Sequence, residues 1–288
     1  MSLLQHHSLE MTGKDVPELE EATPLIPAGT RINVTFLSSE DLTTRLEAAT
    51  AVKAAGLIPV PHIAARRLTG VRELRTILAA LREADVSEHV FVVGGDPQQP
   101  MGPYASALDV IRTGLLPEYG VREVSISGYP EGHPDISDEE LWSALKGKVA
   151  ALAQQGLGAS VITQFGFDEA PIVSWIEHVR AQGIDAPIRI GVPGPAGVTR
   201  LLGFARRFGV ASSAGIVKKY GFSLTNLIGS AGPDRLIGAL TDAVDPARHG
   251  EVLLHFYTFG GVAATARWIR EYTTAPATPR RRHTFTTR

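Results

Sequence analysis

The sequence has no cysteine among its 288 residues. This absence excludes disulfide bonds, thiolate metal ligands and cysteine nucleophiles. No apolar run reaches the roughly 20 residues that a membrane-spanning helix needs. The first residues, MSLLQHHSLEMTG, also lack the long apolar core of a signal peptide. From these absences we expect a soluble, cytoplasmic protein with no membrane partner.

A large excess of charge of either sign is missing too, because 28 Lys and Arg face 30 Asp and Glu. A net charge of -2 gives no electrostatic reason to expect nucleic acid as a partner. Hydrophobic residues make up 44% of the chain, which is typical of a globular protein with a sizeable core. No Pro/Gly/Ser-rich linker divides it. We therefore predict one domain over residues 1–272, followed at 273–288 by a mobile basic tail.

Short apolar runs that end on a polar or ionisable residue recur along the chain. Most are separated by a helical pattern, which indicates buried parallel strands of a single (β/α)8 TIM barrel. The runs are Ser8 to Glu10, Ile32 to Thr35, Leu57 to His62, Val90 to Asp96, Val124 to Tyr129, Val161 to Gln164, Ile188 to Gly191, and Val252 to Thr258.

Helical spacing or capping residues mark the connections. The predicted helices cover about residues 38–55, 70–84, 135–156, 171–183, 196–208 and 262–272. Residues 209–250 predict two or three helical segments and no strand, so extra helices precede the last strand. The alternative is an open doubly wound sheet, which normally carries a Gly-rich phosphate turn after its first strand. Thr12-Gly13-Lys14 stands there instead, so the barrel is favoured.

Reactive side chains of such barrels gather at the C-terminal ends of the strands. Glu10 could then act as a general acid if apolar neighbours raise its pKa, or it could be a surface glutamate near the terminus. The side chains expected to share one pocket are Glu10, Thr35, His62, Asp96, Tyr129 and Gln164.

Three further residues each have a functional and a structural interpretation. Asp96, after the flexible Gly94-Gly95, could accept from an NH-rich heterocycle or belong to an ordinary turn. Gln164 could read a heteroaromatic edge or cap a loop. Lys148 could reach a phosphate at the pocket rim or be a solvated helix lysine.

Several other chemistries lack their motifs. His62 and His133 suggest a metal, yet no HxH or HExxH spacing accompanies them, so no metal site is expected. No nucleophile elbow, Walker loop or strand-end lysine for a Schiff base is visible.

Taken together, the segments resemble the methylenetetrahydrofolate reductase family over about residues 8 to 272. The motifs that carry the resemblance, in the family's order, are Leu9-Glu10, Val34-Thr35-Phe36, Pro61-His62, Gly95-Asp96, Tyr104-Ala105-Ser106, Tyr129 to Pro134, Ile162 to Phe165, and His255 to Thr258.

The resemblance implies a barrel that binds FAD non-covalently and transfers hydride to or from a tetrahydrofolate derivative, with NADH or NADPH as electron donor and a homo-oligomeric assembly. It implies that Glu10 protonates folate N10, that Asp96 and Gln164 hold the pterin edge, and that Phe204 helps to cover the folate. The residues implied to contact FAD are Thr35, His62, Gly95, Asp96, Tyr104, Ala105, Tyr129, His133 and Lys148.

The sequence departs from the family pattern in three places. Gly94 stands where an arginine is common, and Arg66 or Arg67 could substitute for it. Gly166 replaces a phenylalanine, and the segment 190–194 is altered, changes that should open space for the second substrate. Two alternatives therefore stay open: an enzyme that oxidises methyltetrahydrofolate, and a folate- or flavin-binding subunit that needs an electron-donating partner.

Overall fold

A computed structural model describes residues 3–37, 39–207 and 230–275. Its centre is a closed barrel of parallel strands in the order β1-β10-β7-β6-β5-β4-β3-β2. This confirms the predicted TIM barrel, and each predicted apolar run overlaps one of its strands. The strands are β1 (Ser8–Met11), β2 (Arg31–Val34), β3 (Ile58–Ala64), β4 (His89–Val93), β5 (Glu123–Gly128), β6 (Gly158–Thr163), β7 (Ile188–Pro193) and β10 (Val252–Tyr257).

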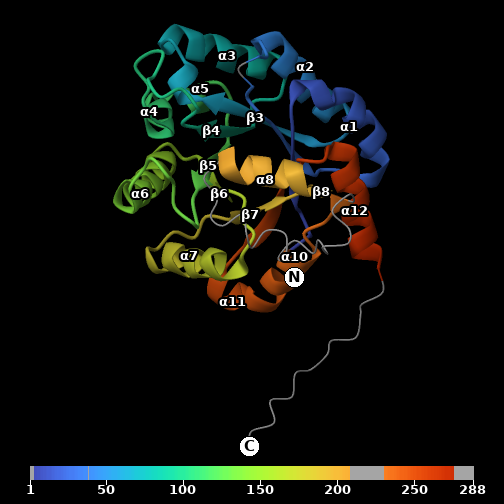
Figure 1. The fold of residues 1–288 in the computed structure, drawn as a ribbon. Helices are drawn as coiled ribbons and strands as arrows, with labels where there is room; N and C mark the ends of the chain where they lie inside the picture. Colours follow the sequence, from blue (N-terminus) through green and yellow to red (C-terminus); the bar gives the residue numbers. More distant parts are fainter. Residues whose placement is uncertain (1–2, 38, 208–229, 276–288) are drawn as a thin grey trace, which may run out of the picture.

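Helices surround the barrel (Figure 1). The six predicted ones are observed as α2 (Leu42–Ala54), α3 (Val71–Glu83), α6 (Asp138–Gln154), α7 (Glu169–Ala181), α8 (Val198–Arg207) and α12 (Val262–Thr274). Local capping explains where two of them begin. The carboxylate of Asp41 accepts from the amide of Thr44 at 2.8 Å, and Ser137 forms a capping box with Glu140.

The sequence did not predict three short helices, α1 (Val16–Ala22), α4 (Ala107–Arg112) and α5 (Leu115–Glu118). Each has too few turns to show an apolar repeat. The region before the last strand holds the predicted helices α10 (Asp234–Ala243) and α11 (Pro246–His249). It also holds β9 (Ser230–Ala231), which pairs antiparallel with β8 (Ala196–Gly197), so the prediction of no strand there was wrong. Residues 208–229 and 276–288, including most of the predicted tail, lie outside the described residues.

Two apolar regions hold the barrel together. The larger one lies between the strands and the surrounding helices and includes Leu9, Ile126 and Phe256, all fully buried. A smaller one combines Val60, Phe91 and Ile162 from three different strands. Burial on both faces explains why the strands appear in the sequence as continuous apolar runs.

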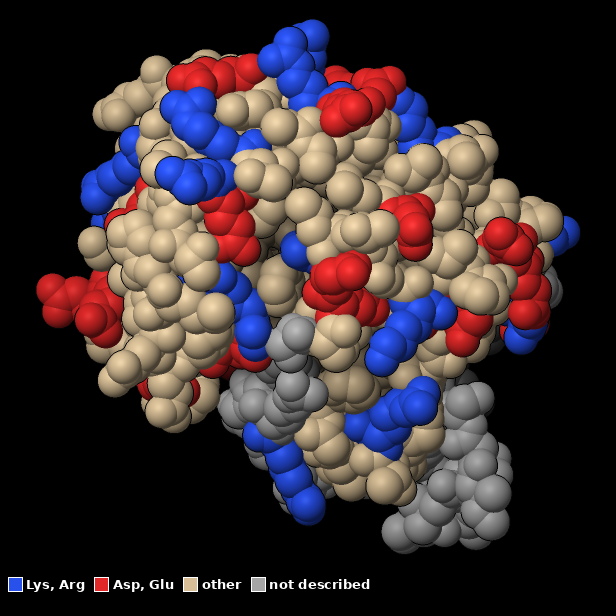
Figure 2. Space-filling model, turned by 90° about the horizontal axis from the view of Figure 1, so that it is seen from above, with Lys and Arg blue, Asp and Glu red and all other residues tan. Residues whose placement is uncertain are grey.

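No helix in the described part of the chain is both long and apolar enough to span a membrane. On the face seen from above, basic and acidic side chains are interspersed (Figure 2). That face therefore offers no broad surface of one sign to attract a charged partner.

Candidate active site

Glu10, near the C-terminal end of β1, is largely buried, with 18% of its side chain exposed. Its Oε2 lies 3.2 Å from Nε2 of His255 on β10. The two residues meet because β1 and β10 are neighbours in the barrel, with Ser8 paired to His255. Thr258 also contacts this residue, because its hydroxyl donates to the backbone carbonyl of Glu10 at 2.6 Å. The surface-glutamate interpretation is therefore wrong, and Glu10 points into a polar site.

The sequence predicted that Glu10 could act as a general acid if its neighbours raise its pKa, but in this structure its pKa is lowered. Burial alone would raise the pKa of Glu10. The hydrogen bond with His255, together with smaller electrostatic contributions from the neighbouring His62 and His255, outweighs burial, so the net shift of the Glu10 pKa is downward. At neutral pH the cluster therefore holds Glu10 as a carboxylate.

His62, on β3, belongs to the same cluster. Burial lowers its pKa to about 4, which keeps the imidazole neutral at physiological pH. Nδ2 of Asn33 lies 3.3 Å from its Nε2. Thr35 also approaches Glu10 closely enough to lower its pKa. Yet Thr35 Oγ1, which is buried, has no partner at full hydrogen-bonding geometry among the described residues.

Tyr257 connects this cluster to the opposite strands. Its hydroxyl donates to the carbonyl of Thr163 at 3.0 Å. Burial, together with the nearby Glu10 and Tyr129, raises its pKa well above the usual value, so it stays a neutral donor. Gln164 follows Thr163 directly, and its backbone carbonyl accepts a hydrogen bond from the Thr163 hydroxyl at 3.0 Å. Among the described residues, its side-chain amide has no hydrogen-bond partner.

Aromatic side chains cover the ends of β6 and β10. The buried Phe165 and Phe167 pack with Tyr257, Phe259 and residues of α8. Phe204 of α8 stacks on Phe259 with ring centroids 4.0 Å apart and planes 11° from parallel. Arg200, also on α8, donates to the backbone carbonyl of Phe259 at 2.8 Å and so fixes the loop after β10. Phe204 therefore lies over the site at the strand ends.

Asp96 has a different partner. Nε and Nη2 of Arg67 donate to its two carboxylate oxygens at 2.7 and 2.6 Å. Arg66 donates its side chain to the Gln98 carbonyl and its amide to the Gly94 carbonyl. Arg66 thus contacts Gly94 directly, as the substitution hypothesis requires, whereas the guanidinium of Arg67 is engaged by Asp96.

Lys148 is buried in α6, so the interpretation as a solvated lysine is wrong. Burial lowers its pKa to about 8, and its Nζ has only a long contact, 3.4 Å, with the Ser127 carbonyl. Tyr129 lies nearby on the following loop and meets His133 edge to face at 5.4 Å. The backbone amide of Asp135 also donates to His133 Nδ1, so this imidazole stabilises its own loop.

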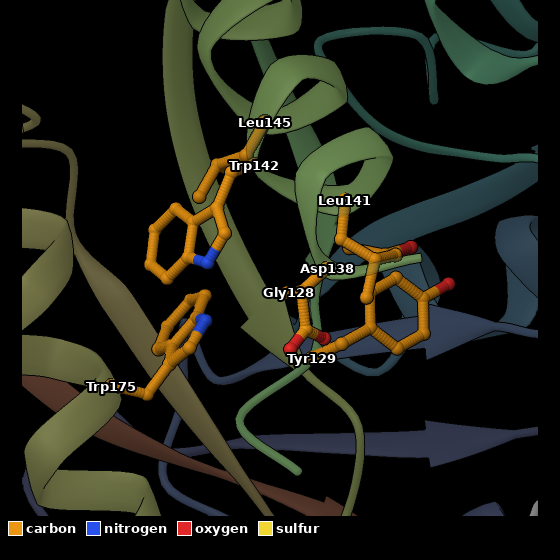
Figure 3. A pocket seen from close by; sticks show the side chains of 8 residues that line it. Gly128, Tyr129, Asp138, Leu141, Trp142, Leu145 and Trp175 are labelled. Atoms are coloured by element: carbon orange, nitrogen blue, oxygen red, sulfur yellow. The ribbon is translucent and has the colours of Figure 1, made fainter. Parts of the chain in front are cut away.

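A small pocket opens beside Tyr129, with the stacked side chains of Trp142 and Trp175 on one side (Figure 3). Its volume of about 20 Å³ suits one water molecule and is far too small for a flavin ring. The lining residues are Ser127, Gly128, Tyr129, Asp138, Leu141, Trp142, Leu145 and Trp175.

Other predicted contacts have structural roles here. Tyr104 is buried in the main core, and the amide of Ala105 donates to Asp109 at the start of α4. Gly95 adopts φ +96°, a conformation that favours glycine. The prediction that Gly166 opens space was wrong, because a Cβ there would lie 3.1 Å from Glu131 Oε1 and 3.2 Å from Ile172.

Sequence reasoning did not include His255, Tyr257 or Asn33 among the site residues. The signal was present in the last strand, where His255 and Tyr257 stand two positions apart within an apolar run. Alternate residues of a strand point to the same face, so both were candidates for the same side of the barrel.

By fold and site, this chain is a (β/α)8 barrel with an ionisable cluster at the C-terminal ends of its strands. A family model described as methylenetetrahydrofolate reductase matches residues 15–214. The chain belongs to the methylenetetrahydrofolate reductase family. The matched range includes Thr35, His62 and Lys148, whereas Glu10 and His255 lie outside it.

Two curated relatives are also named as methylenetetrahydrofolate reductases. The 5,10-methylenetetrahydrofolate reductase of Salmonella typhimurium is 30% identical over 209 residues, covering 70% of this chain and 66% of that protein. Methylenetetrahydrofolate reductase (NADH) 1 of Arabidopsis thaliana is 28% identical over 135 residues, covering 42% of this chain and 22% of that protein. The aligned regions thus span two thirds or less of these relatives.

A solved structure has the same fold over nearly the whole chain. It is an uncharacterised protein from Clostridium thermocellum that binds two copies of 5-methyl-5,6,7,8-tetrahydrofolic acid. The TM-score is 0.54 at 10% identity, with 93% of this chain and 96% of that one covered. At this identity the likeness concerns the fold alone.

Proposed function

We propose that the protein is an FAD-dependent oxidoreductase that interconverts 5,10-methylenetetrahydrofolate and 5-methyltetrahydrofolate. The observation that carries the proposal is the buried cluster of Glu10, His62 and His255 at the strand ends, in a chain that belongs to this family. A structural neighbour that binds a methylated tetrahydrofolate adds support from the fold.

The residues present fit a flavin nucleotide. Lys148 is a buried cation with only a weak carbonyl contact, which suits a phosphate oxygen. Thr35 offers a buried hydroxyl without a full partner among the described residues, and His62 a neutral imidazole. Gly95 lets the backbone approach a ligand closely. These residues, with Tyr129, would hold FAD, which supplies the acceptor and donor of hydride when bound.

The chain's own task is to move a proton and to exclude water. Glu10 would deliver a proton to N10 of the folate as the bond between the methylene carbon and N10 breaks. Because its pKa is lowered here, the bound folate must raise it, and displacement of water by an apolar ring acts in that direction. Gln164 would hold the pterin edge, and Phe204 on α8 would cover the substrate.

Glu10→Gln tests the proposal. We expect the variant to bind FAD with an unchanged visible spectrum but to lose folate turnover by about 10²- to 10⁴-fold, the usual contribution of a general acid. The matched control is Glu20→Gln, because Glu20 is an exposed glutamate on α1. This variant should keep full activity. Turnover of the Glu10 variant at the control's rate would remove Glu10 from the mechanism.

The direction of the reaction and the electron donor need a separate experiment. The Arabidopsis relative carries NADH in its name, and we propose NADH or NADPH as the donor here. Anaerobic reduction of the bound flavin by NADH, NADPH or 5-methyltetrahydrofolate, followed separately, distinguishes the cases. Reduction by the folate alone would favour an oxidising enzyme, and no reduction by any of them a subunit that needs a partner.

A further inference from the structure

The Glu10 carboxylate is the outer member of a chain of three polar groups that leads into the barrel. Oε2 of Glu10 lies 3.2 Å from Nε2 of His255, and Nδ1 of the same ring lies 2.9 Å from the hydroxyl of Ser8. His255 and Ser8 have no exposed surface at all. The arrangement is a carboxylate, an imidazole and a hydroxyl in line, all on the adjacent strands β1 and β10.

Hydrogen-bonding capacity fixes the direction of this chain. An ionised carboxylate can only accept, so Nε2 of His255 carries a hydrogen and donates it to Glu10. In a neutral ring Nδ1 is then the acceptor, and it accepts from the Ser8 hydroxyl. The Glu10 carboxylate thereby selects the tautomer that carries the hydrogen on Nε2, and the contact of Ser8 with Nδ1 fixes the plane of the ring.

Other groups around Glu10 cannot replace His255. His62 faces Glu10 from β3, but its Nε2 is taken up with Asn33. Tyr257, from β10, directs its hydroxyl to the Thr163 carbonyl. Thr35 faces Glu10 from β2 without full hydrogen-bonding geometry. Among the described residues, the one side chain with a hydrogen bond to the Glu10 carboxylate is His255.

We infer that His255, held in orientation by Ser8, is a positioning residue that keeps Glu10 ionised and oriented until substrate binds. This inference rests on the proposed function for its use in catalysis, although the contact itself can be tested without folate. The consequence is specific. When His255 loses its N–H, Glu10 should take up a proton at a higher pH than in the native protein.

The experiment measures the protonation of Glu10 directly, by infrared difference spectroscopy of its carboxylic acid C=O band, with Glu10→Gln identifying the band. In His255→Leu we expect the midpoint to rise by about one pH unit, because a hydrogen bond to the charged form is lost. Ser8→Ala removes a single oxygen and should move the midpoint in the same direction by less. This second variant keeps the test valid if His255→Leu does not fold.

His249→Gln is the matched control, because His249 is equally buried but bonds to Asp245 and Glu177, outside the Glu10 cluster. Its Glu10 midpoint should equal that of the native protein. Unchanged midpoints in both His255→Leu and Ser8→Ala would overturn the inference. If folate does not bind at all while the midpoints still shift, the proposed function fails and the positioning role of His255 stands.

Discussion

Replacement of Lys148 by methionine should stabilise the cofactor-free protein. The lysine is 7% exposed, and burial lowers its pKa from 10.5 to about 8. A difference of one unit in pKa corresponds to about 1.36 kcal/mol, so carrying the charge at pH 7 costs the folded state roughly 3 kcal/mol. Methionine has nearly the same length and no charge, and it should recover most of that energy.

The effect has a defined pH dependence. The folded pKa lies below the unfolded one, so between about pH 8 and pH 10.5 the unfolded chain binds more protons than the folded protein. The free energy of unfolding should therefore rise with pH in this window, while the full cost applies below pH 8. Lys148→Met should lack this rise.

Urea unfolding of the cofactor-free protein from pH 7 to pH 10 measures the difference. The control is Lys146→Met, an exposed lysine on the same helix, whose curve should run parallel to that of the native protein. Parallel curves for Lys148→Met and the native protein would refute the argument. The same substitution should weaken binding of FAD, because the cation proposed to face a phosphate is lost.

Two other substitutions test different properties, namely stability at Asp41 and ligand binding at Asp96. Asp41→Ala removes the side-chain cap of α2 and should lower the free energy of unfolding measured by urea titration, with an unchanged value counting against the capping role. Asp96→Asn weakens an ion pair with Arg67 in which the carboxylate is 66% exposed, so stability should change by less than about 1 kcal/mol. The proposed role of Asp96 predicts that folate affinity and flavin potential nevertheless shift, and it is wrong if both stay at native values.

The strands of the barrel could be predicted because parallel strands buried on both faces appear as continuous apolar runs. Strand-end placement also predicted that Glu10, Thr35 and His62 lie together. The contact of Glu10 with His255 could not be predicted in the same way. It depends on closure of the barrel, which pairs the first strand with a strand almost 250 residues away.

Other details depend on contacts that no local pattern encodes. Arg67 meets Asp96 only because the loops after β3 and β4 fold against each other. Gly166 suggested empty space in the sequence, yet Glu131 and Ile172, from other segments, fill it. Burial of Lys148 likewise depends on how α6 packs on β5, since its sequence neighbours Lys146 and Gly147 are those of an ordinary helix surface.

The visible absorption spectrum of the protein, recorded after incubation with FAD and removal of the free cofactor, tests the central claim most directly. The account predicts retained bands of oxidised flavin that bleach when 5-methyltetrahydrofolate is added without oxygen. A protein that emerges colourless, or one whose flavin neither folate nor reduced nicotinamide nucleotide can reduce, would contradict it.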